Sequence, residues 1–211
     1  MKKNLQFSTI IFDLGNVVLN IYPERTEQAF KDLGLNSFNE YYTLVSQTKI
    51  FDLLETGKIS PKEFYKYLRE ITGIKLTDQQ IEFAWNQVIG YYPKPNIEYL
   101  LKLKDKLPIF LLSNTNAIHY PVYTKLLDND FGIANLNELF KKCFLSHEIA
   151  YRKPDVEIYK YVQEEINFSS NEILFIDDSI ANIEAANNFG WQTILYTHNK
   201  IEDALFNVVN L

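Results

Sequence analysis

Short apolar runs, each followed at once by polar residues, constrain the fold of this chain more than any other feature. Four runs are rich in β-branched residues and free of charge, and a fifth is weaker; they cover residues 9–12, 109–112, 173–176, 193–196 and, for the weaker one, 143–145. Such runs are typical of parallel strands that are buried on both faces. Helical patterns lie between them, for example at 155–166 and at 180–189 before Gly190. The alternation predicts an α/β fold with a doubly wound, Rossmann-like parallel sheet.

The stretch 20–92 interrupts this alternation, because it contains helical patterns and no convincing strand. Ser60-Pro61-Lys62-Glu63 reads as a capping box with proline in the first turn, and Gly73 as the end of that helix. A second helix is expected to open at Thr77 and to end at Gly90. We therefore expect an all-helical domain at 20–92, inserted after the first strand of an α/β core that comprises 1–19 and 93–211. Pro93-Lys94-Pro95 is interpreted as the linker back to the core.

Length and composition limit the classes of function. A chain of 211 residues can bury one core plus a small inserted domain. Its net charge of -6 argues mildly against nucleic acid as a partner, and no apolar stretch approaches the ~18 residues that would suggest a membrane partner. Cys143 is the single cysteine, which favours a reducing compartment such as the cytoplasm. The oligomeric state is left open.

Reactive side chains follow several of the predicted strands. Asp13 follows the first strand, Ser113 and Asn114 follow the second, Lys153 comes after the weak one, and Asp177-Asp178 follow 173–176. In an open parallel sheet the ligand lies beyond the carboxyl ends of the strands, where these residues would meet. Each alone could be a turn former, a helix cap or a solvated charge. Two adjacent carboxylates near a third acid, however, repel one another unless a cation lies between them.

Four segments carry a resemblance to a known family. Asp13-Leu14-Gly15-Asn16-Val17, Ser113-Asn114, Arg152-Lys153-Pro154, and Phe175-Ile176-Asp177-Asp178-Ser179 with Asn182 resemble, in order and spacing, the four motifs of the haloacid dehalogenase-like hydrolases. The first two segments are closest to a bacterial subgroup that includes glucose-1-phosphate phosphatase. The resemblance implies a Rossmann-like core with an inserted helical cap, and a magnesium-dependent phosphatase that acts on a small phosphorylated metabolite, with sugar phosphates among the candidates.

The resemblance also implies roles for individual residues. Asp13 would be the nucleophile that forms an aspartyl-phosphate, while Ser113, Asn114 and Lys153 would hold the phosphoryl oxygens. Lys153 would also offset the charge of the nucleophile. Mg²⁺ would be held by Asp13, Asp178 and the Gly15 carbonyl, with Asp177 holding a metal-bound water, although the two neighbouring acids could exchange roles.

Gly15 departs from the pattern of most phosphatases in the family, which carry a second Asp two residues after the nucleophile as general acid and base. Three explanations stay open: a good leaving group such as a sugar 1-phosphate, an acid supplied by the helical insertion, or a catalytically weak relative that binds a phosphorylated metabolite. A metal-free 2-haloacid dehalogenase is the rival enzyme, and Asp177-Asp178 count against it.

The inserted helices would cover the site and contact the part of the substrate that lies beyond its phosphate. Candidate contacts are Tyr22, Arg25, Glu55 and Lys58. His119 lies close enough to the predicted site to be considered as a proton donor.

Overall fold

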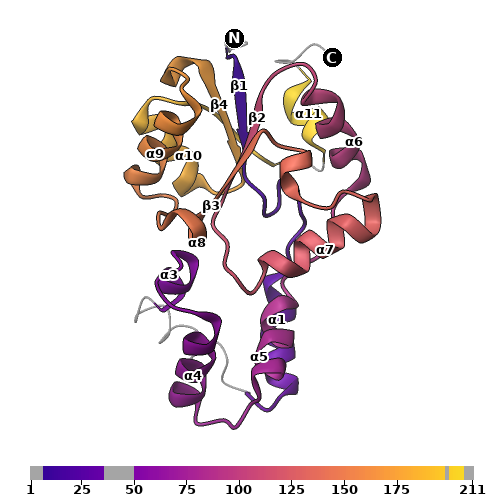
Figure 1. Ribbon diagram of the computed structural model, residues 1–211, viewed down its shortest axis with the longest axis vertical. Coiled ribbons are helices and arrows are strands. Elements are labelled where there is room, and N and C mark those ends of the chain that lie inside the picture. The colour runs from indigo at the N-terminus through magenta and orange to yellow at the C-terminus, as the bar shows by residue number, and fades with distance from the viewer. Residues whose placement is uncertain (1–6, 36–49, 198–199, 207–211) are drawn as a thin grey trace.

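Five parallel strands form the sheet of the computed structural model, which describes residues 7–35, 50–197 and 200–206. The strands are β1 (Thr9–Phe12), β2 (Ile109–Ser113), β3 (Lys142–Leu145), β4 (Ile173–Asp177) and β5 (Gln192–Leu195). Their order across the sheet is β3-β2-β1-β4-β5, and every neighbouring pair is parallel. The predicted α/β fold and its five strands are confirmed, and no strand end differs from the predicted one by more than one residue (Figure 1).

Helices cover both faces of this sheet because its strands are apolar on both faces. Ile10 and Phe12 of β1 pack into one cluster with α6 (Lys94–Leu103), α7 (Tyr120–Phe131) and α11 (Ile201–Leu205). Ile11, between them, points to the opposite face and packs with α9 (Val156–Ile166) and α10 (Ile180–Phe189). Alternate residues of a strand face opposite sides, so a fully apolar strand needs a helical layer on each. The short elements α8 (Ser146–Ile149), η1 (Leu136–Glu138) and η2 (Ser170–Glu172) complete the core.

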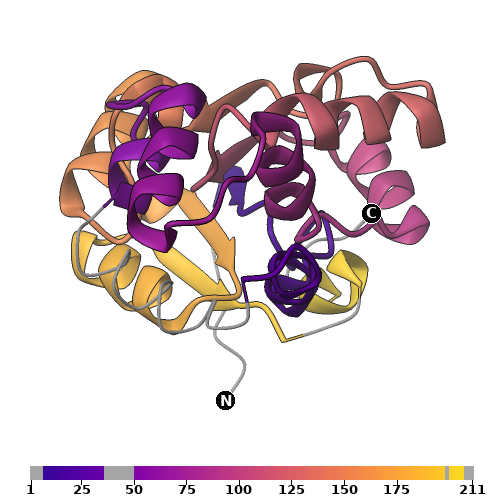
Figure 2. The same ribbon diagram turned by 90° about the horizontal axis from the view of Figure 1, so that it is seen from below.

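In the described part of the chain, four helices form a separate body, called the helical insertion here, next to the carboxyl ends of the strands. They are α1 (Pro23–Asp32), α3 (Ile50–Glu55), α4 (Pro61–Thr72) and α5 (Asp78–Asn86), and they share a hydrophobic cluster that includes Phe30, Phe64 and Ile81. Figure 2 looks from this side and shows the four helices in front of the sheet. Both predicted capping boxes are confirmed, at Ser60 and at Thr77. The boundaries at 19/20 and 92/93 stay a prediction, and residues 36–49 lie outside the described part.

Two expectations about this region are wrong. Helix α5 ends at Asn86 and not at Gly90. Gly90 instead lies where the chain returns to the core, and a Cβ there would come within 2.6 Å of the Asn20 carbonyl oxygen, so the crossing requires glycine. Pro93-Lys94-Pro95 is not a linker, because Pro93 caps α6 and Pro95 lies in its first turn.

No helix within the described ranges combines the length and the apolar character that crossing a bilayer requires.

Candidate active site

The centre of the site is a buried ion cluster at the carboxyl ends of β1 and β4. Asp13 follows β1, and Asp177 is the last residue of β4. The Lys153 Nζ atom lies 2.6 Å from Asp13 Oδ1 and 2.6 Å from Asp177 Oδ2, and it also donates to the Leu112 carbonyl at 2.9 Å. Lys153 is 1% exposed. A charge removed from water this completely is tolerated only when paired and hydrogen-bonded, as it is here.

Asn114 positions this lysine through the backbone. Its side-chain Nδ2 donates to the Lys153 carbonyl at 2.8 Å, and its Oδ1 accepts from the Lys153 N–H at 2.9 Å. Both polar groups of the Asn114 side chain are therefore used within the protein. Nδ2 carries two N–H groups and the contact with the Lys153 carbonyl uses one of them, so the expected contact of Asn114 with a phosphoryl oxygen stays a prediction.

The two neighbouring acids lie in different environments. Asp177 is buried, and its oxygens accept hydrogen bonds from the Ser179 N–H at 2.8 Å and from the Asn182 amide at 3.0 and 3.1 Å, besides the Lys153 contact. Asp178 is exposed and accepts a hydrogen bond from Asn16 Nδ2 at 2.9 Å. Asn16 has a φ of 55°, a left-handed conformation that asparagine adopts more readily than most residues. The sequence analysis assigned no role to Asn16, since its contact joins two loops that are distant in the chain.

The charges of the cluster fit a bound divalent cation. Asp13, Asp177 and Asp178 each offer a carboxylate oxygen, and these atoms lie within 4.8 Å of one another. Burial raises the pKa of Asp13 to about 7, although Lys153 opposes this rise. Burial by itself would lower the pKa of Lys153, but the carboxylates of Asp13 and Asp177 raise it above its usual value. Lys153 thus contacts two of the three clustered carboxylates, and an oxygen-ligated cation such as Mg²⁺ would balance the remaining negative charge.

Gly15 and Ser113 complete the wall of the site. Ser113 is the buried last residue of β2. A Cβ on Gly15 would lie 3.2 Å from the Ile21 side chain and 3.9 Å from Asp13 Oδ2. Gly15 therefore lies beside the Asp13 carboxylate, but it brings no acidic group to this position.

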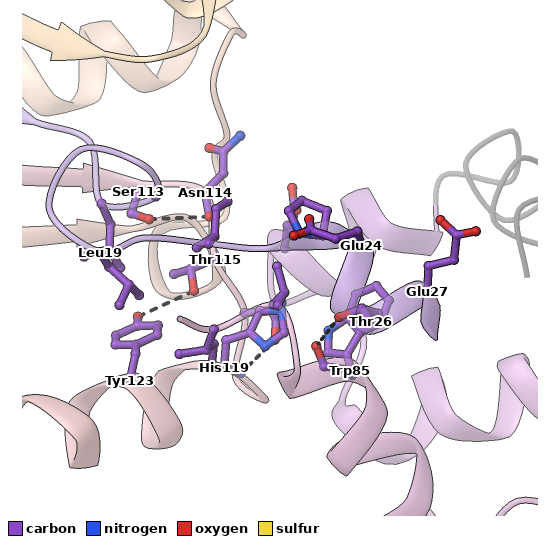
Figure 3. A pocket seen from close by; sticks show the side chains of 18 residues that line it. Leu19, Glu24, Thr26, Glu27, Trp85, Ser113, Asn114, Thr115, His119 and Tyr123 are labelled. Atoms are coloured by element: carbon purple, nitrogen blue, oxygen red, sulfur yellow. Dashed lines mark hydrogen bonds between the residues drawn. The ribbon is translucent and has the colours of Figure 1, made fainter. Parts of the chain in front are cut away.

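A cavity of about 680 Å³ separates these residues from the helical insertion. Gly15, Ser113 and Asn114 line it from the core, and the carboxylates that line it are Glu24, Glu27 and Glu55. Figure 3 labels Ser113 and Asn114 on the core side, with Glu24 and Glu27 on α1. Its described lining contains no lysine and no arginine. Of the four residues expected to contact the substrate, Glu55 lines this cavity, whereas Tyr22, Arg25 and Lys58 do not.

Two contacts that the sequence analysis did not predict connect the helical insertion to the core. Arg152, next to Lys153, forms ion pairs with Asp52 and Glu55 of α3. His119, at the start of α7, makes a 2.8 Å hydrogen bond through Nδ1 with Asn86 Oδ1 and stacks on the Trp85 ring. Burial lowers the pKa of His119 to about 3, so the imidazole is neutral at pH 7. This does not support the expectation that His119 donates a proton.

Comparison with known proteins gives results consistent with this geometry. A family model described as haloacid dehalogenase-like hydrolase matches residues 7–190. The D-ribitol-5-phosphate phosphatase of Bacteroides thetaiotaomicron is 32% identical over 186 residues, which are 87% of this chain and 89% of that protein. The sesquiterpene phosphatase astK of Aspergillus oryzae is 29% identical over 188 residues, 87% of each chain.

The structural comparison includes a liganded relative. The HAD family enzyme bt-2542 of Bacteroides thetaiotaomicron, in complex with magnesium and inorganic phosphate, superimposes with a TM-score of 0.84 and 33% identity. The match covers 95% of this chain and 99% of that chain.

Proposed function

The chain belongs to the haloacid dehalogenase-like hydrolase family, and from that premise we propose that it is a magnesium-dependent phosphatase of small phosphate monoesters. The observation that carries the proposal is the cluster in which Asp13 meets Lys153, Asp177 and Asp178. A carboxylate attacks a phosphate dianion only where positive charge offsets the repulsion between them. Lys153 supplies part of that charge, and the three carboxylates suit a cation that supplies the rest.

Each predicted residue has a role in this proposal. Asp13 is the nucleophile, and Lys153 stabilises the charge on the phosphoryl oxygens. Ser113 Oγ and Asn114 also hold these oxygens, Asn114 through its backbone N–H or through the second N–H of the amide that contacts Lys153.

Asp13, Asp178 and the Gly15 carbonyl would hold Mg²⁺, which when bound neutralises the phosphate and the surrounding acids. Asp177 is assigned to the outer shell, because its oxygens already accept hydrogen bonds from protein donors. The burial of Asp177 and the exposure of Asp178 support this assignment.

The cavity favours a substrate with one phosphate and an uncharged, hydroxyl-bearing tail. The exposed Glu24 carboxylate repels a second phosphate or a carboxylate, and the described lining contains no lysine or arginine that would compensate. The relative that acts on D-ribitol 5-phosphate supports the same class. We therefore propose an alditol or sugar monophosphate as substrate. Glucose 1-phosphate, suggested by the sequence subgroup, is one member of this class.

The rival activities receive less support. In a metal-free dehalogenase, Asp177 and Asp178 would add negative charge next to a negatively charged halo-acid. A protein that only binds a phosphorylated metabolite would not need a lysine so close to a buried carboxylate. As the single cysteine, Cys143 is consistent with a cytoplasmic location, which we retain as part of the proposal.

Hydrolysis of 4-nitrophenyl phosphate tests the proposal directly. The protein should release nitrophenol and inorganic phosphate with Mg²⁺, EDTA should stop the release, and Asp13→Asn should abolish it. Asp105→Asn is a matched control, because Asp105 is exposed and precedes β2 at the opposite end of the sheet. Robust turnover by Asp13→Asn would contradict the nucleophile assignment.

Two further measurements test the rival functions. Chloride release from 2-chloropropionate without Mg²⁺ would support the dehalogenase. Binding of alditol and sugar phosphates without turnover would support the metabolite-binding role.

A further inference from the structure

We infer that Glu55 of α3 is the general acid and base of the reaction, in place of the acid that Gly15 lacks; this inference rests on the proposed phosphatase function. The proposed nucleophile has no second carboxylate two positions later in the chain. The helical insertion brings one to the same cavity from the opposite side.

Glu55 lines the cavity together with Gly15, which lies beside the Asp13 carboxylate. Glu55 is the last residue of α3, and Ser113 and Asn114 line the same cavity. The other two glutamates of the lining are less suited to hold a proton near the ester oxygen. Glu24 is exposed, and Glu27 Oε1 lies 2.6 Å from the Lys31 ammonium.

The core fixes the position of Glu55 through Arg152. Arg152 Nη2 lies 3.0 Å from Glu55 Oε2, and the same guanidinium group pairs with Asp52, one turn earlier on α3. Because Arg152 directly precedes Lys153, the backbone that places the phosphate-binding lysine also places the partner of Glu55. Oε2 is the oxygen that faces Arg152, and among the described residues it is buried without a hydrogen-bond partner.

A second contact holds the end of α3 against the core. Gly57 follows Glu55 by two residues and adopts a φ of +64°. A Cβ at this position would lie 2.2 Å from the carbonyl oxygen of His147, at α8. The turn after Glu55 therefore lies directly on the core backbone, which limits how far the carboxyl group can move from the cavity.

The surroundings of Glu55 shift its pKa in the direction that a general acid requires. Burial raises the pKa of Glu55, and the nearby Asp52 adds to this rise, while Arg152 and Lys153 oppose it. A raised carboxyl pKa is typical of catalytic acids. His119 is the other candidate at this cavity. Its imidazole is neutral at pH 7 and carries one N–H, which the hydrogen bond to Asn86 Oδ1 uses.

The proposed steps conserve atoms and charge. Asp13 attacks phosphorus, the bond from phosphorus to the ester oxygen breaks, and that oxygen takes the proton of Glu55 and leaves as the alcohol. Glu55 is then a carboxylate. It takes a proton from the incoming water while the water oxygen bonds to phosphorus and the bond to Asp13 breaks. Inorganic phosphate leaves, and Asp13 and Glu55 return to their starting forms.

Leaving-group dependence tests this role, because a strongly acidic leaving group needs little help from a general acid. We compare kcat/KM for 4-nitrophenyl, phenyl and n-butyl phosphate, of which the last has no hydroxyl group that Glu55 could bind. Glu55→Gln should lower kcat/KM for n-butyl phosphate by about 10² to 10⁴. It should leave 4-nitrophenyl phosphate nearly unchanged, with phenyl phosphate between the two.

Glu24→Gln is the matched control, since Glu24 is an exposed glutamate that lines the same cavity. This variant should keep the wild-type ratios among the three esters. Equal slowing of all esters by Glu55→Gln, no slowing of any, or the same leaving-group dependence in Glu24→Gln would overturn the role of Glu55 and leave the phosphatase standing. Failure of the wild-type protein to hydrolyse any of the esters with Mg²⁺ would overturn the proposed function itself.

Discussion

The Lys153 ammonium and the Asp13 carboxylate lie 2.6 Å apart, although 140 positions separate them in the sequence. The lysine also contacts Asp177, so one cation links the ends of β1 and β4. This arrangement makes Lys153 important for stability as well as for the proposed reaction.

Lys153→Met should destabilise the protein by about 3–5 kcal/mol, because it leaves buried carboxylates without their partner. It should also lower kcat by at least about 100-fold, as expected when one group that stabilises the transition state is lost. Urea denaturation measures the first effect, and added Mg²⁺ should reduce it by binding the freed acids. Lys142→Met, which removes the half-exposed ion pair with Glu165, should cost about 1 kcal/mol or less. Similar costs for both variants would contradict the structural role of Lys153.

Asn16→Gly should weaken Mg²⁺ binding by about 10- to 100-fold, since it removes the amide that orients Asp178. Glycine suits the φ of 55° at this position, so the loop should keep its conformation. Titration of the activity with Mg²⁺ measures the change. Asn188→Ala, at an exposed position on α10, serves as the control. If Asn16→Gly requires the same Mg²⁺ concentration as the wild-type protein, the orientation of Asp178 by Asn16 does not contribute to metal binding.

Gly57→Ala should be more destabilising than Gly73→Ala, although both glycines have nearly the same backbone conformation, with φ of +64° and +66°. A Cβ at Gly73 meets nothing within 4 Å, so its replacement should cost only the left-handed strain of about 1–2 kcal/mol. At Gly57 the Cβ would collide with the His147 carbonyl oxygen and push α3 from the core. Thermal unfolding should show the difference, and only Gly57→Ala should lose activity toward alkyl phosphates. Equal destabilisation by the two substitutions would mean that α3 can shift away from His147 without loss of stability.

His119→Gln should make stability less sensitive to acid. The folded pKa of His119 is about 3, and the unfolded value is about 6.5. Its neutral form is favoured by folding, so the stabilisation is fully present above the unfolded pKa and is lost as the pH falls below it. Between pH 7 and pH 5 the wild-type protein should lose up to about 2 kcal/mol more than His119→Gln. Parallel curves of unfolding free energy against pH would show that His119 titrates normally.

Local patterns in the sequence predicted the strands and the helix starts correctly. The apolar run at 173–176 and the capping boxes at Ser60 and Thr77 depend on residues near one another in the chain. The same kind of reasoning failed at Gly90, which is glycine because two distant segments cross there and not because a helix ends.

The sequence predicted which residues meet at the site, but not how they hold one another. Asp13, Lys153 and Asp177 were expected together because parallel strands share one edge of the sheet. Asn114 was expected to hold a phosphoryl oxygen, which stays a prediction, but the binding of its side chain to the Lys153 backbone was not foreseen. The pair of Arg152 with Glu55 was missed because it depends on how the helical insertion packs against the core.

The central position of β1 in the sheet determines how long this strand remains unpaired while the protein is being synthesised. Ile11 pairs on one side with Phe110 and on the other with Phe175, so the first strand leaves the ribosome long before either neighbour exists. The helices of residues 23–86 are synthesised during that interval and share a cluster almost entirely of their own. Contacts between distant parts of a chain form slowly, which leaves an apolar strand exposed during synthesis. A nascent chain that stops before Phe175 therefore carries an unpaired strand edge, which makes it a target for chaperones and a starting point for aggregation.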